Sequence, residues 1–228
     1  MSLSHGANVV RNGLILCLDA ANPKSYPGSG TAWTDLSSNG NNGTLVNGPT
    51  YNSANGGSIG FDGTNDYGTI PFNSAFNVTS NPFTVIIWNK KNTTSNGFNG
   101  LITADISGDN TWKIYKDNGE TFYKSRSGSS ILSFPNYVVG RWHMYAYTKS
   151  GSTLTNYFDG NLVGSNLSAT NPSSFSNNLA LGSYRLNDAQ AGLYLMDQNF
   201  AICMFYNRAL SAVEVQQNFN ATRGRYGI

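Results

Sequence analysis

Charged residues are scarce in this sequence. Only 11% of its 228 residues are Asp, Glu, Lys or Arg, whereas ordinary soluble domains have about 25%. The net charge is +2 and the basic residues form no cluster, so no nucleic-acid partner is expected. Asn, Ser, Thr and Gly must supply the polar surface instead. That composition favours an extracellular or virion-surface protein.

Long apolar segments are also missing. No run approaches the roughly 20 residues that cross a bilayer, so we expect no membrane insertion. The opening Met1–Gly6 lacks the basic start and apolar stretch of a signal peptide, so classical secretion is not expected. Cys17 and Cys203 each lie in an apolar run, which favours two buried free thiols. The alternative is a disulfide between them, which requires that the first and last strands are neighbours.

Short apolar runs separated by turn residues fill most of the chain. This spacing predicts an all-β sandwich, and the 13 Tyr and 12 Phe residues favour strands. The expected strands are Gly13–Asp19, Gly43–Val46, Ser58–Phe61, Tyr67–Pro71, Phe83–Trp88, Leu101–Ala104, Trp112–Tyr115, Ile131–Phe134, Arg141–Thr148, Leu154–Phe158, Leu179–Tyr184, Gly192–Leu195 and Phe200–Tyr206.

Two segments show the β pattern most clearly. In Arg141–Thr148, Trp142, Met144 and Ala146 alternate with His143, Tyr145 and Tyr147, which is the period of two that a strand requires. Asp159-Gly160 stands between two apolar pairs. Both residue types accept a positive φ, so a type I′ hairpin is expected there.

One helix is expected near the end of the chain. Ser211 and Glu214 have the spacing of a capping box, and Leu210 and Val215 that of a hydrophobic staple. The helix should run from Ala212 to Phe219 or Asn220. We expect one domain over residues 13–222, with an N-terminal arm at 1–12 and a C-terminal tail at 223–228.

An ordered set of motifs resembles one known family. Its members are Phe61-Asp62-Gly63-Thr64-Asn65-Asp66-Tyr67, Pro82–Trp88, Gly140–Met144, Tyr157–Gly160, Leu181-Gly182 and Phe205–Ser211. The set is similar to the laminin G-like jelly rolls of the concanavalin A-like lectin/glucanase superfamily, and this resemblance implies a sandwich of two antiparallel sheets. This family often carries an acidic segment before the last motif. The corresponding stretch here, Asn199–Cys203, has no carboxylate.

The opening of the chain resembles a narrower group. Gly13–Tyr26, Trp33–Ser37 and Gly40–Gly43 look like the openings of laminin G-like proteins of tailed bacteriophages. The resemblance implies a virion structural or adhesion protein.

Enzymatic activity is not expected, although the superfamily includes glucanases. Retaining hydrolysis needs two carboxyl groups about 5–5.5 Å apart. The only two glutamates are Glu120, in a Gly-rich turn, and Glu214, in the capping box. His143 is the best single acid–base candidate, since His5 lies in the arm, but a structural role for a strand histidine is favoured.

Two groups of residues are candidates for binding. Asp62, Asn65 and Asp66 offer closely spaced oxygens for Ca²⁺, but the same residues make turns, so no cofactor is the favoured interpretation. An aromatic surface for sugar stacking competes with core packing, which is the default for strand aromatics. Its members would be Trp112, Tyr115, Tyr145 and Tyr147.

Two functions follow as hypotheses. The first is a non-enzymatic bacteriophage structural protein, such as a capsid decoration, fibre or tail component on the particle surface. It would contact other virion proteins in several symmetry-related copies, held by the arm 1–12, the tail 223–228 or both, since the arm has few apolar groups to bury in its own domain. The alternative is an adhesin that binds a cell-surface glycan.

Overall fold

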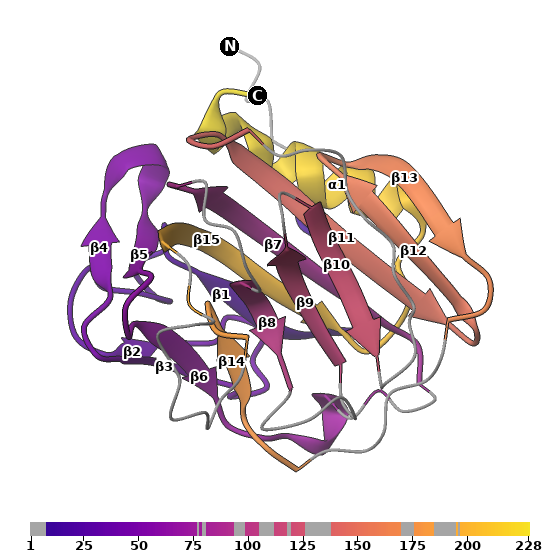
Figure 1. Ribbon diagram of the computed structural model, residues 1–228, viewed down its shortest axis with the longest axis horizontal. Helices are drawn as coiled ribbons and strands as arrows, with labels where there is room; N and C mark the ends of the chain where they lie inside the picture. The colour runs from indigo at the N-terminus through magenta and orange to yellow at the C-terminus, as the bar shows by residue number, and fades with distance from the viewer. Residues whose placement is uncertain are drawn as a thin grey trace.

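The architecture is a sandwich of two antiparallel sheets, seen in a computed structural model of the chain (Figure 1). The structure describes residues 8–76, 78, 81–93, 99–104, 112–117, 120–125, 138–169, 176–184, 195 and 197–228. All the strand pairs in these ranges are antiparallel, which confirms the predicted fold class. The helix near the C-terminus, Ala212–Thr222, lies outside the larger sheet.

The larger sheet has eight strands. Its order is β13 (Asn161–Asn166), β12 (Thr153–Phe158), β11 (Trp142–Ser150), β7 (Phe83–Lys91), β15 (Asp197–Tyr206), β5 (Ser58–Asp62) and β4 (Thr50–Asn52). The eighth strand, β1 (Leu14–Asp19), pairs with β15 as well. One edge of β15 therefore contacts β7 throughout, and its other edge contacts β5 first and β1 afterwards.

The smaller sheet has seven strands. Its order is β10 (Glu120–Ser125), β9 (Trp112–Asp117), β8 (Asn99–Thr103), β14 (Leu179–Leu181), β6 (Tyr67–Ile70), β3 (Gly43–Val46) and β2 (Ala32–Trp33). Short helical turns occur at η1 (Ala54–Gly56), η2 (Ser74–Phe76) and η5 (Arg223–Tyr226), and α1 spans Ala212–Thr222. The expected strand 131–134 lies outside the described residues. Of 192–195 only Leu195 is described, in an isolated bridge with Ser183.

Two apolar clusters hold the layers together. One fills the space between the sheets and contains Phe83, and the other lies between the larger sheet and α1 and contains Trp88. Both side chains are fully buried. The alternation in β11 is also confirmed, because Trp142 and Met144 enter the second cluster while Tyr145 enters the first.

The two local motifs form as predicted. Asp159 and Gly160 have φ of +48° and +78°, the pair of positive values that a type I′ turn needs. Ser211 Oγ accepts from the Glu214 backbone N–H, and the Glu214 carboxylate accepts from the Ser211 N–H at 2.9 Å. The helix continues to Thr222, past the predicted end, because Thr222 is buried and its hydroxyl accepts from Trp88 Nε1 at 2.9 Å.

The cysteines do not form a bond. Cys17 lies opposite Met204 in the β1–β15 register, one position away from Cys203. Successive strand residues point to opposite faces, so Cys17 joins the cluster under α1 and Cys203 the one between the sheets. Both are free thiols.

Both ends of the described chain pack on their own domain. The Val10 N–H donates to Asn218 Oδ1 at 2.8 Å, and the Val10 carbonyl accepts from the Tyr206 hydroxyl at 2.9 Å. Tyr226 stacks on Trp88 with ring centroids 4.2 Å apart. Residues 8–12 and 223–226 thus have partners within the domain, although the arm has few apolar groups to bury there. Residues 1–7 lie outside the described part.

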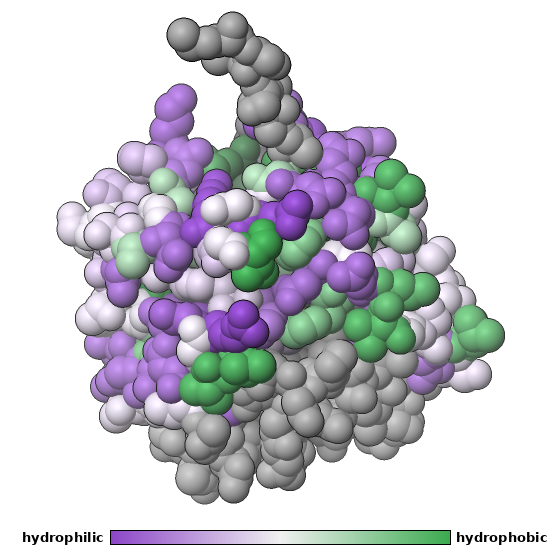
Figure 2. Space-filling model, turned by 90° about the horizontal axis from the view of Figure 1, so that it is seen from above, coloured by the Kyte–Doolittle hydropathy of each residue, from purple (hydrophilic) through white to green (hydrophobic). Residues whose placement is uncertain are grey.

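The surface over α1 is mainly hydrophilic. Seen from that side, hydrophobic side chains form small patches between polar ones (Figure 2). None of the helices in the described ranges is long and apolar enough to span a membrane.

Candidate functional site

A polar cleft lies where β5 ends and β15 begins. It has a volume of about 290 Å³. Its lining carries three carboxylates, two amides and one hydroxyl, with a glycine and a buried phenylalanine between them. These residues are Thr50, Gly60, Phe61, Asp62, Asp66, Asn92, Asp197 and Asn199.

Sheet register brings two of the carboxylates together. Asp62 is the last residue of β5 and Asp197 the first of β15, and the two are direct partners in the antiparallel ladder. Like charges at directly opposed positions repel. Asn92, just beyond β7, offsets part of this repulsion because its amide donates to Asp197 Oδ1 at 2.6 Å. Its backbone N–H also donates to the main-chain carbonyl of Asp197 at 3.1 Å.

An amide network fixes the floor of the cleft. Asn199 Nδ2 donates to Asn92 Oδ1 at 2.7 Å. Asn89, which is buried on β7, donates to the Asn199 carbonyl at 3.1 Å and to Gln198 Oε1 at 2.9 Å. Each amide is therefore oriented by its neighbour, so the oxygens facing the cleft are held in place before any ligand arrives.

The turn after β5 supplies the remaining acid. Asp62 Oδ1 accepts from the backbone N–H groups of Thr64 and Asn65 at 2.7 and 3.3 Å, and these bonds lower the pKa of Asp62. Asp66 is only 4% exposed. Burial first, and then the nearby charge of Asp62, raise the pKa of Asp66.

The three candidate calcium ligands do not all line the cleft. Asp62 and Asp66 line the cleft, whereas the Asn65 side chain is not among its lining residues. Within the described ranges, no three or more His, Cys, Asp or Glu side chains are grouped so as to hold a metal ion. Both Asp62 and Asp66 act in the turn, Asp62 as an acceptor for Thr64 and Asp66 as an acceptor for the Asp62 N–H at 3.4 Å.

The four aromatic candidates do not share an exposed surface. Trp112, Tyr145 and Tyr147 belong to the cluster between the sheets, which confirms core packing for them. Tyr115 lies on the other face of β9, edge-on to Tyr184 with ring centroids 5.1 Å apart. All four candidates are at most 6% exposed.

His143 has a structural partner. Its Nδ1 lies 2.9 Å from Asp159 Oδ2, and Asp159 Oδ1 accepts from the Met144 N–H at 2.8 Å. The imidazole also stacks on Phe158 at 4.6 Å. These contacts tie the hairpin to β11. The buried Nε2 has no hydrogen-bond partner among the described residues.

The two glutamates lie apart from the cleft lining. Glu214 Oε1 accepts from Arg208 at 2.7 Å in addition to its capping role. Glu120 is the first residue of β10, opposite Asp117. Neither residue lines the cleft.

Asn92, Asp197 and Asn199 were not found from the sequence. The acidic segment of the family corresponds to Asn199–Cys203 here, and Asp197 lies two residues before that stretch. The available signal was an Asp three residues before the last expected strand, Phe200–Tyr206.

Comparisons with known proteins agree with this architecture. The family described as the concanavalin A-like lectin/glucanases superfamily matches residues 61–216, more than half of the chain. No curated protein matches the sequence significantly.

Several solved structures share the fold at low sequence identity. The binding domain of Paraclostridial Mosquitocidal Protein 1 has a TM-score of 0.71 and 16% identity, over 92% of this chain and 52% of that one. The botulinum neurotoxin serotype D binding domain has a TM-score of 0.71 and 14% identity, over 93% and 52%. A Trypanosoma rangeli sialidase in complex with sialic acid has a TM-score of 0.69 and 14% identity, over 93% and 33%. This chain thus spans between a third and about half of these proteins.

Proposed function

Since the chain belongs to the concanavalin A-like lectin/glucanases superfamily, we propose that it is a glycan-binding protein whose site is the cleft beside Asp62 and Asp197. The observation that carries the proposal is the fixed array of oxygens and amides around Asp197. Sugar hydroxyl groups both donate and accept hydrogen bonds, so a lining of carboxylates and amides complements them. Hydrogen bonds to charged acceptors are also the stronger ones.

The charge of the cleft narrows the ligand class. Its lining carries Asp62, Asp66 and Asp197, and none of its lining residues is Lys or Arg. An anionic sugar such as sialic acid needs a cation to offset its carboxylate. We therefore propose neutral glycans, and the sialic acid in the sialidase complex is not carried over to this chain.

Binding without hydrolysis is the second part of the proposal. The pKa of Asp66 is raised, as a general acid requires. At 4% exposure, with Oδ2 facing the Asp62 N–H, it is aimed at the backbone of its own turn rather than at a glycosidic oxygen.

An array of immobilised neutral and sialylated glycans tests the ligand class. We expect saturable binding to neutral glycans and none that depends on sialic acid. Binding confined to sialylated glycans would contradict the assignment of the cleft. Release of reducing sugar from a bound glycan would contradict the absence of catalysis.

The biological setting is a separate proposal. The phage-like opening at Gly13–Tyr26 and the low content of charged residues support a virion-surface protein present in several copies, alongside other virion proteins. Residues 8–12 and 223–226 are engaged within the domain, so attachment through the arm would rest on residues 1–7. Mass spectrometry of purified particles, with the intact chain and with residues 1–7 deleted, tests this. Absence of the intact chain from particles contradicts the virion setting, and full incorporation of the truncated chain contradicts attachment through residues 1–7.

A further inference from the structure

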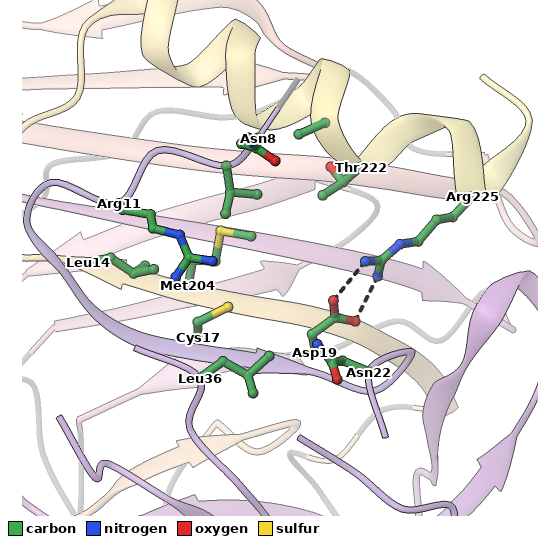
Figure 3. Close-up of a pocket in the computed structure, with 12 residues that line it drawn as sticks. Asn8, Arg11, Leu14, Cys17, Asp19, Asn22, Leu36, Met204, Thr222 and Arg225 are labelled. Atoms are coloured by element: carbon green, nitrogen blue, oxygen red, sulfur yellow. Dashed lines mark hydrogen bonds and ion pairs between the residues drawn. The ribbon is translucent and has the colours of Figure 1, made fainter. Parts of the chain in front are cut away.

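A second hollow lies over β1, and it shares no lining residue with the polar cleft. It has a volume of about 220 Å³. A cavity of about 150 Å³ is enough to hold benzene, so this one has room for a ring with a small substituent. Its walls come from the segment 8–11, the end of α1 and η5, and its base from β1 and β15 (Figure 3).

The base of this hollow is apolar and rich in sulfur. Leu14, Cys17 and Met204 form it, and each is less than 10% exposed. Met and Cys sulfurs make favourable contacts with aromatic rings. Burial first, and then the charges of Asp19 and Asp35, raise the pKa of Cys17 to about 12. The thiol therefore stays protonated and provides a packing surface rather than a nucleophile.

Two guanidinium groups stand at the rim, and they differ in what they contact. Arg225 is fully engaged, because it donates twice to the Asp19 carboxylate at 2.7 and 2.8 Å. Arg11 reaches inward over Met204 and Cys17 in Figure 3. It is exposed, and within the described part of the chain its guanidinium has no hydrogen bond or ion pair.

Asp19 is paired with Arg225, and the nearby Asp35 carboxylate accepts from the Cys17 N–H at 2.8 Å and from the Ser37 hydroxyl at 2.7 Å, so the positive charge left for a ligand is that of Arg11. A ligand with a single carboxylate balances that charge, and a planar carboxylate also matches the two parallel N–H groups of a guanidinium. We propose that this hollow binds a small aromatic monocarboxylate, with its carboxylate on Arg11 and its ring on Cys17 and Met204.

The test is a two-dimensional amide NMR titration of the full chain with benzoate. Benzamide serves as the uncharged ligand of the same shape. Arg11→Gln removes the charge from the hollow, and Arg141→Gln is the matched control, since Arg141 is an exposed arginine outside the hollow. Unfolding temperatures show whether each variant is folded.

We expect benzoate to shift the amide signals of Cys17, Leu36 and Ala221. Arg11→Gln should weaken binding by about tenfold or more, as the loss of one charge-assisted contact does. Benzamide should bind the native chain about as weakly, and Arg141→Gln should leave benzoate binding unchanged.

Three results would overturn the proposal. One is no saturable shift up to about 20 mM benzoate, well above the millimolar range expected of so small a ligand. Another is equal binding of benzoate by the folded Arg11→Gln variant. The third is a set of shifted amides outside the hollow.

Discussion

Asp62 and Asp197 face each other across the β5–β15 ladder, and Asn92 holds Asp197 at two points, with its amide on the carboxylate and its backbone N–H on the main-chain carbonyl. The arrangement places two negative groups side by side at the mouth of a cleft. Asn92, itself bound by Asn199, holds the Asp197 carboxylate, and the backbone N–H groups of Thr64 and Asn65 hold that of Asp62, so the cleft is ordered without a ligand. Because the cleft side chains are already ordered, the protein loses less side-chain entropy when a sugar binds.

The capping box gives the first prediction. Ser211→Ala removes the hydroxyl that accepts from the Glu214 N–H, and the free energy of unfolding should fall by about 1 kcal/mol. Urea denaturation followed by circular dichroism measures it. Ala212→Ser, in the exposed first turn, is the control and should change stability by less than about 0.5 kcal/mol.

The second prediction concerns the charge of Glu214. Hydrogen bonds from Arg208 are the largest cause that lowers its pKa to about 2. A carboxyl whose folded pKa is lowered stabilises the fold above its unfolded pKa, and this contribution disappears as pH falls through the folded value. Glu214→Gln keeps the capping geometry and should cost about 1 kcal/mol at pH 7, allowing for partial exposure. The cost should vanish towards pH 2. A cost independent of pH would show that the ion pair is not its source.

The third prediction concerns Asp66, whose ionised carboxylate affects stability in the opposite direction to that of Glu214. Its folded pKa is raised by burial, so its carboxylate destabilises the fold at neutral pH. This penalty is relieved as pH falls through the raised folded pKa, and it is gone below the ordinary pKa of Asp. Asp66→Asn retains an oxygen that can accept from the Asp62 N–H. Thermal unfolding from pH 3 to pH 7 should show the variant more stable than the native chain only at the upper end. A less stable variant at pH 7 would contradict this account.

The fourth prediction concerns the stack under η5. Tyr226 lies 4.2 Å from Trp88 and 4.9 Å from Trp142, measured between ring centroids. Tyr226→Ala should cost about 3 kcal/mol, in the range of large aromatic truncations in a core. Arg223→Ala, on the same turn but exposed, should cost far less. Equal effects in chemical denaturation would mean that the tail does not stabilise the domain.

The sequence predicts most strands because local patterns determine them. Periodicity identifies β11, and the residue types of the turn identify the Asp159-Gly160 hairpin. The strands β2 and β4 were missed because they are short, and β10 because Glu120 was assigned to a Gly-rich turn. The hairpin prediction implies β13, whose bounds were not given in advance.

Only part of the cleft could be predicted, because sequence patterns report residues that are close together along the chain. Asp62 and Asp66 belong to one turn, and their spacing makes them visible as a pair. Asn92 and Asp197 meet only because β15 lies between β7 and β5, in a register that the sequence does not reveal. Core packing, the favoured interpretation of the aromatic residues, is confirmed for Trp112, Tyr145 and Tyr147. The sugar-stacking alternative had stayed open because periodicity gives the face of a strand and not what covers that face.

The most direct test of the account is a calorimetric titration with the neutral glycan that gives the strongest array signal. Asn92→Ala removes the amide that orients Asp197 and Asn199, and Asn161→Ala removes an exposed asparagine outside the cleft as the control. We predict that Asn92→Ala weakens binding by about tenfold or more, while Asn161→Ala binds like the native chain. Unchanged affinity in a folded Asn92→Ala variant would contradict the claim that this cleft is the glycan site.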